Sequence, residues 1–207
     1  MRRARALVPA VGLLAILALG LLAGCQKLQN LKEEFDPRLS QADQAYQGAV
    51  EPYLAQGVVR GGPATEMQAK ALPLTPTVRR AWAQRAALAQ SLDQAATAQL
   101  LAQEEAEAAK GLEVVLSLYV PERQWSDLTA PRPDWRVFIQ DGAGQRLEPQ
   151  DIRLIRERER SALNQSLYYF WGPWDRLFRV RFDRPAPPAR LVITGAPGRV
   201  EMPLKLD

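Results

Sequence analysis

The chain has 207 residues, with 27 Lys and Arg against 23 Asp and Glu, a single cysteine and no histidine. The missing histidine excludes Ser-His-Asp and Cys-His triads, and one cysteine without histidine excludes a zinc or haem site built from these residues. Three arginines near the N-terminus supply most of the net charge of +4, and no basic block follows them, so a nucleic-acid partner is not expected.

The first 24 residues have the layout of an export signal. Arg2, Arg3 and Arg5 precede an uncharged run, rich in Leu, Ala, Ile, Val and Gly, that extends to Gly24. A basic region, an apolar region and closing small residues are typical of a secretory signal peptide, which predicts removal of residues 1–24. An uncleaved anchor helix is the alternative, because the run is about long enough to span a bilayer.

The stretch from Leu22 to Cys25, LAGC, stands in register with that signal. It resembles the lipobox of bacterial lipoproteins. The resemblance covers residues 1–25 and implies cleavage before Cys25, with a diacylglycerol on its thiol and a further acyl chain, such as palmitate, on its amino group in many bacteria. Because each buried methylene contributes about 0.8 kcal/mol, two or three chains make a stable anchor.

The residue after the cysteine is Gln26. In this class of lipoproteins an Asp there tends to retain the protein in the inner membrane. Gln26 therefore implies the outer membrane, facing the periplasm or the surface, if the host has two membranes.

Residues 25–110 are expected to form a lipid-anchored helical segment. Asp36 and Pro37 are typical of an N-cap and a first helical residue, which predicts a helix over about 37–56 that ends before Gly57. Residues 57–75 hold three Gly and two Pro and are interpreted as a long connection. Thr75 and Pro76 give a second helix start signal, and residues 77–110 contain neither Gly nor Pro and are rich in alanine, which predicts one long helix over 76–110. The two helices are expected to form an antiparallel hairpin.

After Gly111 the apolar residues recur with a period of two, which indicates strands. Strands are predicted over residues 112–120, 134–140, 151–155, 167–171, 176–183, 189–194 and 199–206. Turn residues at 141–144 (DGAG) and 195–198 (GAPG) join two pairs of them. About seven short strands in residues 111–207 predict an antiparallel β-sandwich of immunoglobulin-like type, so the fold class is α+β.

The densest aromatic stretch is LYYFWGPWDRLF, residues 167–178. Successive strand residues point to opposite faces, so its four consecutive aromatic residues cannot all lie in a core that buries one face. The outward ones have three alternatives: packing beneath a helix, stacking on a glycan, or contact with a partner protein or the membrane interface. The candidates for ligand or partner contact are Trp125, Trp135, Tyr169, Trp171 and Trp174.

Two charged stretches have alternative interpretations. Residues 155–161, IRERERS, are expected to be a solvated strand edge or loop, with lipid-headgroup or polysaccharide binding as the alternative. Glu104, Glu105 and Glu107 are expected on a solvated helix face, with half of a carboxylate metal site as the alternative. Carboxylate-only chemistry, as in glycosidases, stays open.

These patterns favour a non-enzymatic lipoprotein of the cell envelope that needs no cofactor. Its expected partners are the lipid bilayer, through acylated Cys25, and an envelope protein, in support of an envelope or secretion-type assembly. A glycan-binding module that uses Trp125, Trp135, Trp171 and Trp174 is the second hypothesis, and a carboxylate-dependent hydrolase is the third.

Overall fold

The computed structural model describes the backbone of residues 37–207 and the side chains of residues 41–207. Residues Ala42–Asp207 form one compact unit. The predicted signal peptide, the lipobox and Cys25 lie outside the described residues.

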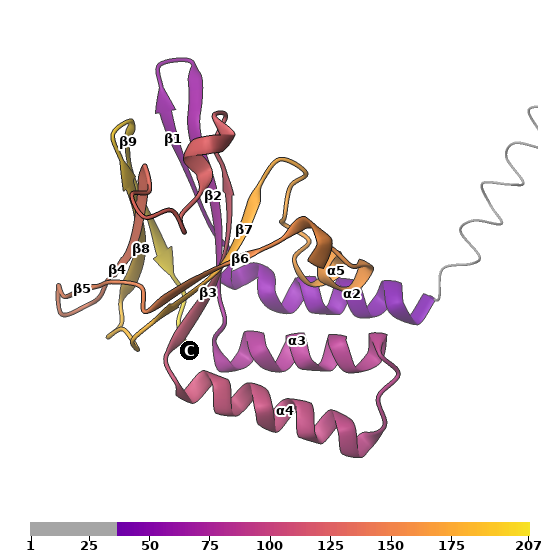
Figure 1. Ribbon diagram of the computed structural model, residues 1–207. Coiled ribbons are helices and arrows are strands. Elements are labelled where there is room, and N and C mark those ends of the chain that lie inside the picture. Colours follow the sequence, from indigo (N-terminus) through magenta and orange to yellow (C-terminus); the bar gives the residue numbers. More distant parts are fainter. Residues whose placement is uncertain (1–36) are drawn as a thin grey trace, which may run out of the picture. The chain divides into compact units, whose positions relative to one another are not determined.

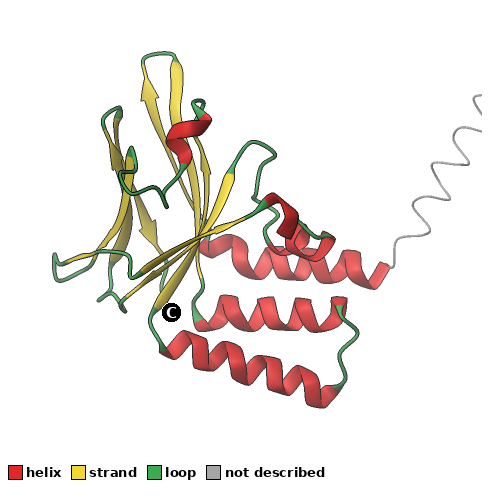
Figure 2. Ribbon diagram, viewed as in Figure 1, coloured by secondary structure: helices red, strands yellow, loops and turns green. Residues whose placement is uncertain are grey.

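Nine strands form two antiparallel sheets (Figures 1 and 2). The five-stranded sheet has the order β1-β2-β3-β7-β6, and the four-stranded sheet has the order β5-β4-β8-β9. The strands are β1 (Ala55–Gly61), β2 (Ala64–Pro73), β3 (Leu112–Tyr119), β4 (Trp135–Gln140), β5 (Arg146–Leu147), β6 (Asp151–Ile155), β7 (Arg176–Phe182), β8 (Ala189–Gly195) and β9 (Gly198–Leu204).

The two sheets share one apolar core. Alternate residues of β3, namely Val114, Leu116 and Leu118, point into this core. In β4, Trp135 and the residues two and four positions later point into it as well. On one side β1 lies against β9 with little space between them: a Cβ added to Gly57 would lie 2.5 Å from Cγ2 of Val200. Glycine at this position allows the two strands to approach.

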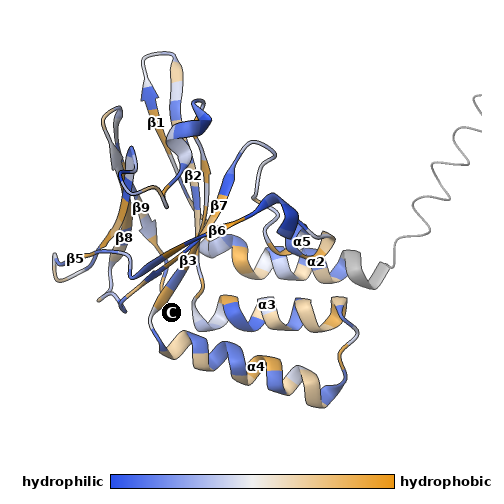
Figure 3. Cartoon of the chain, viewed as in Figure 1, coloured by the Kyte–Doolittle hydropathy of each residue, from blue (hydrophilic) through white to orange (hydrophobic). Residues whose placement is uncertain are grey.

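The helices are α2 (Pro37–Val50), α3 (Pro76–Ala89), α4 (Gln94–Ala109) and the short α5 (Ala162–Leu167). Three 3₁₀ turns accompany them: η1 (Glu51–Tyr53), η2 (Arg123–Ser126) and η3 (Glu157–Glu159). In Figure 3 both apolar and hydrophilic residues follow one another along α3 and α4, as expected for helices with one buried side.

A second apolar core joins the helices to the outer face of the five-stranded sheet. It includes Leu72, Val115 and Leu177 from the sheet and Val50 and Val78 from α2 and α3. The domain therefore has three layers: the four-stranded sheet, the five-stranded sheet and the helices.

The helix predicted over residues 76–110 is wrong as a single element, because α3 ends at Ala89 and α4 begins at Gln94. Ser91 has φ +52°, and the Asp93 carboxylate accepts the Ala96 N–H at 2.8 Å as the N-cap of α4. Ser and Asp side chains compete for backbone hydrogen bonds, which favours a helix end here. The close helix pair is α3 with α4, and the predicted pairing of residues 37–56 with 76–110 is not confirmed.

The connection predicted over residues 57–75 is also wrong, because this segment is the β1–β2 hairpin, and the helix predicted to reach residue 56 ends at Val50. Met67, Ala69 and Ala71 alternate into the core, but Ala is depleted in strands and gives a weak signal. Gly62, with φ +62°, lies in the turn that was interpreted as part of a linker.

Six of the seven predicted strands are present to within about two residues. The exception is 167–171: Leu167 ends α5, and residues 168–170 form a turn. Ser161 caps α5 by accepting the Asn164 N–H at 3.1 Å, so a helix start signal lies just before the aromatic residues.

Candidate functional site

The aromatic segment between β6 and β7 packs beneath the helices. Tyr168, Phe170 and Trp171 are buried in the second core, and Tyr169 packs partly buried against it. This is the first of the three alternatives that the sequence leaves open. Because α5 and the turn replace the predicted strand, the four aromatic residues do not alternate between two sheet faces.

Two tyrosine hydroxyls hold this segment against α2 and against η1, which follows α2. Tyr46 of α2 donates its hydroxyl to the Leu167 carbonyl at 2.9 Å, and burial, with Tyr168 and Tyr169 nearby, raises its pKa far above the ordinary value. The Tyr169 hydroxyl donates to a Glu51 carboxylate oxygen, and burial together with that carboxylate raises its pKa. Both hydroxyls therefore stay protonated and act as donors.

A pocket of about 270 Å³ opens beside this segment, lined by Arg160, Gln165, Tyr169, Trp171 and Pro173. The Arg160 guanidinium lies 4.2 Å from the centroid of the Trp171 ring, and its Nη2 donates to the Gly172 carbonyl at 2.9 Å. The ring face that a sugar would need is thus covered by a guanidinium held on the backbone.

Several hydrogen bonds close the turn after Trp171. The Asp175 carboxylate accepts the Gly172 N–H at 3.1 Å and the Ser117 hydroxyl at 2.6 Å, and the Trp171 indole N–H donates to the Asp175 carbonyl at 3.0 Å. Trp174, in the middle of this turn, is 76% exposed.

The five predicted contact residues do not form one surface. Trp135 is 1% exposed in the core between the sheets, and Trp171 is 8% exposed beneath the helices. Only Trp125, at 40%, and Trp174 present large exposed surfaces, while Tyr169 is half-buried. A glycan platform built from all four predicted tryptophans therefore does not exist in this fold.

A buried ion cluster joins α3, α4 and β3, and the sequence analysis missed it. Arg79 is 4% exposed; its Nη1 lies 2.6 Å from Glu104, its Nη2 lies 2.8 Å from Glu113, and its Nε donates to the Leu74 carbonyl at 3.2 Å. Arg179 of β7 approaches Glu113 at 3.6 Å. One signal was available: Glu113 interrupts an otherwise apolar strand, and a buried carboxylate needs a cation.

Basic side chains pair with two of the carboxylates considered as a metal or catalytic site. Glu104 is held by Arg79, and Glu107 lies 2.5 Å from Lys110 and 3.3 Å from Arg181. Among residues 41–207 no group of three or more Asp, Glu, His or Cys side chains is placed to hold a metal ion. In the charged stretch 155–161, Ile155 ends the edge strand β6 and the remaining residues form η3 and its flanks, in agreement with the expected strand edge or loop.

Searches of protein-family models, of curated proteins and of solved structures each return no match for this chain. In the part of the chain that the structure describes, no helix is both long and apolar enough to cross a membrane.

Proposed function

We propose that this chain is an acylated lipoprotein of the bacterial cell envelope that acts as a non-enzymatic structural or interaction module. The observation that carries the proposal is the sequence LAGC at residues 22–25, in register behind a basic and an apolar region. Cys25 would then be the first residue of the mature protein and its covalent link to the membrane.

The packing of the domain supports a structural role. Buried polar side chains hold the helices against the sheet. Arg79 binds Glu104 and Glu113, and Tyr46 binds the segment that precedes Tyr168. Such contacts rigidify a scaffold, since a satisfied buried polar network specifies one arrangement of its neighbours.

We further propose an immunoglobulin-like topology for the two sheets. In that topology the strand orders are A-B-E-D in one sheet and C-F-G, with C′ added beside C in variable-type domains, in the other. The orders β2-β3-β7-β6 and β5-β4-β8-β9 correspond to them strand by strand, with β1 added at the edge. Domains of this architecture serve widely as adhesion and assembly modules, which is an analogy of fold and not of site.

We place the module at the outer membrane of a host with two membranes, because Gln26 follows the cysteine. Its partner would be another component of the envelope, such as an export or secretion assembly. This assignment rests on the lipoprotein class and on the absence of histidine and of a second cysteine from the sequence.

The experiment is a Cys25→Ser substitution in the full chain, with Gln26→Asn as the matched control. We expect wild type and the control to incorporate labelled palmitate and to fractionate with membranes. Cys25→Ser should incorporate none and remain as the unprocessed precursor. Equal processing, labelling and fractionation of Cys25→Ser and wild type would show that the lipoprotein assignment is wrong.

A further inference from the structure

Two tryptophan side chains are exposed on the surface of the domain. Trp174 and Trp125 are 76% and 40% exposed, whereas Trp135 and Trp171 are buried. Trp125 belongs to η2, which follows β3, and Trp174 belongs to the turn that precedes β7. An indole costs free energy in water and is favoured where an apolar phase meets a wet one.

The fold brings these two tryptophans to the same end of the five-stranded sheet. Strands β3 and β7 are antiparallel, with Leu118 opposite Arg176, so the end of one strand lies beside the start of the other. Arg176 then bridges the two loops: its Nη1 lies 3.2 Å from Asp127, and its Nη2 donates to the Arg123 carbonyl at 3.5 Å. Figure 1 shows the η2 segment and the loop before β7 at this end.

Each tryptophan is presented by a fixed backbone. The Gly172–Asp175 turn is closed by its own hydrogen bonds and tied to β3 through Ser117. In η2, the Trp125 N–H donates to the Glu122 carbonyl at 2.8 Å, and the Ser126 hydroxyl donates to the Arg123 carbonyl at 2.7 Å. The side chains are therefore held outward before any partner arrives, which lowers the entropy cost of binding.

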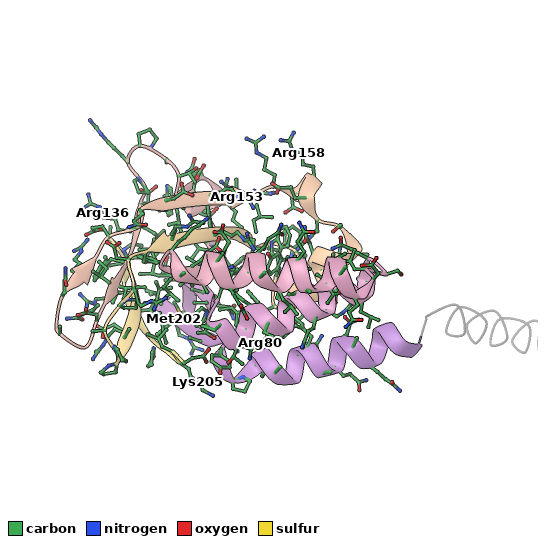
Figure 4. The ribbon with its side chains drawn as sticks, turned by 90° about the horizontal axis from the view of Figure 1, so that it is seen from below. Arg80, Arg136, Arg153, Arg158, Met202 and Lys205 are labelled. Atoms are coloured by element: carbon green, nitrogen blue, oxygen red, sulfur yellow. The ribbon has the colours of Figure 1, made fainter. Side chains whose placement is uncertain are left out.

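Arginines without an ion pair among the described residues lie at the same end of the sheet. Arg123 belongs to η2, and Arg156 and Arg158 lie in η3 and its N-cap, directly after the point where Ile155 of β6 pairs with Leu177 of β7. Arg153, Arg160 and Arg176 each pair with an acidic residue. Figure 4 shows Arg158 extending away from the ribbon. Guanidinium groups and exposed indoles at one end of the sheet match the anionic headgroups and the interface of a phospholipid layer.

The lipid tether alone does not orient the domain. Twelve steps of the chain lead from Cys25 to Pro37, where α2 begins, and at most about 3.6 Å each they reach about 43 Å. A domain of this size has a radius of gyration near 15 Å, so a link of that reach leaves more than one face available to the bilayer. A second contact is needed to fix which face meets the bilayer.

We propose that Trp125 and Trp174 dock this end of the domain into the headgroup layer of the membrane that carries the Cys25 anchor. This inference rests on the proposed function, which supplies the membrane. The two tryptophans form an interfacial anchor, and Arg123, Arg156 and Arg158 contact the phosphate groups. Docking would give the domain a defined orientation on the membrane.

The test uses the mature chain from residue 25 with Cys25→Ser, so that acylation contributes nothing. Vesicles of phosphatidylethanolamine and phosphatidylglycerol, with and without brominated acyl chains, are the probe. We expect the chain to co-float with the vesicles and brominated lipid to quench its tryptophan emission. Trp125→Ser with Trp174→Ser should weaken vesicle partitioning by at least about tenfold.

Leu88→Ser is the matched control, because Leu88 is 44% exposed on α3, a different element, and its loss should leave partitioning unchanged. Far-ultraviolet circular dichroism checks that the double variant is folded. No flotation of the parent chain, or equal flotation of the double variant, would overturn the inference. So would crosslinking of residue 174 to a protein in intact envelopes without any quenching by brominated lipid.

The two proposals fail separately. Absence of palmitate at Cys25 with vesicle binding intact would overturn the lipoprotein assignment alone. Palmitate at Cys25 without vesicle binding would overturn the docking surface alone.

Discussion

Arg79 links the helical layer to the five-stranded sheet through buried ion pairs. Its guanidinium satisfies Glu113, which is 8% exposed on β3, and Glu104 on α4. Removing one partner of a buried pair leaves an uncompensated charge, which costs far more than the pair contributes. The consequence is specific to this position, because the adjacent Arg80 is exposed.

We expect Arg79→Met to lower the free energy of unfolding by about 3 kcal/mol, because Glu113 keeps only the more distant Arg179. Arg80→Met, the matched control, should change it by less than about 0.5 kcal/mol. Urea unfolding followed by circular dichroism measures both. The double variant Arg79→Met with Glu113→Leu should recover most of the loss; equal instability of the single and double variants would refute the ion-pair explanation.

At the scale of single residues, the absence of histidine limits the chemistry that the sequence allows. Trp174, one of the five contact candidates, is exposed, and its role as a contact stays a prediction. The burial of Trp171 was not predictable, since it depends on the path of the chain after α5. Trp135 is buried with Val137 and Ile139 on one face of β4, as the period of two implies. Arg79 was missed because its partners lie 25 and 34 residues away in sequence.

At the scale of elements, the start of α3 shows how distant segments complete one another. The Asp207 carboxylate accepts the Thr77 N–H at 2.8 Å and the Tyr53 hydroxyl at 2.8 Å. Partial burial opposes ionisation, but these hydrogen bonds together hold the pKa of Asp207 below its ordinary value. The first turn of α3 is thus stabilised from the segment that follows β9.

This lowered pKa predicts a pH dependence. A carboxyl group whose pKa is lower in the folded state adds stability above its unfolded pKa, near 3.9, and loses it as the pH falls through the folded value. We expect Asp207→Asn to lower the melting temperature at neutral pH and the difference from wild type to vanish in strong acid. A melting-temperature difference that persists unchanged at the acid end would contradict this role.

Some helices and strands could be predicted from the sequence pattern and others could not. Strands with branched apolar residues, such as β3 and β8, were located to within a residue or so, because their period of two is clear. The β2 strand presents Met and Ala to the core, and the α3–α4 break rests on three polar residues in a helix-favouring context. In both cases tertiary packing and local capping overrode intrinsic propensity.

For the whole molecule, the contact of β1 with β9 closes one side of the two-sheet core. A Cβ on Gly57 would lie 2.5 Å from Val200 and 3.0 Å from Met202 Cγ, whereas one on Gly48 of α2 meets nothing within 4 Å. Gly57 is therefore closely packed and Gly48 is not, so the same substitution can be compared at the two positions.

Gly57→Ala should lower the free energy of unfolding by about 1–3 kcal/mol, because β1 must move away from β9. Gly48→Ala should raise it by about 0.5–1 kcal/mol, because alanine loses less conformational freedom than glycine in a helix. Denaturant titration of both variants measures the difference. The closure of this side by β1 would be refuted if Gly57→Ala were as stable as wild type or if Val200→Ala did not relieve its defect.

The α3–α4 pair leaves the five-stranded sheet at Pro73 and returns at Leu112, and Pro73 pairs with Val114 across the two strands. Entry and exit therefore lie side by side, as in a hairpin turn. The cost of closing such a loop grows only with the logarithm of its length. We therefore expect whole helical turns inserted at the far end of this pair, away from Arg79 and Glu104, to leave the strand register and the β core intact.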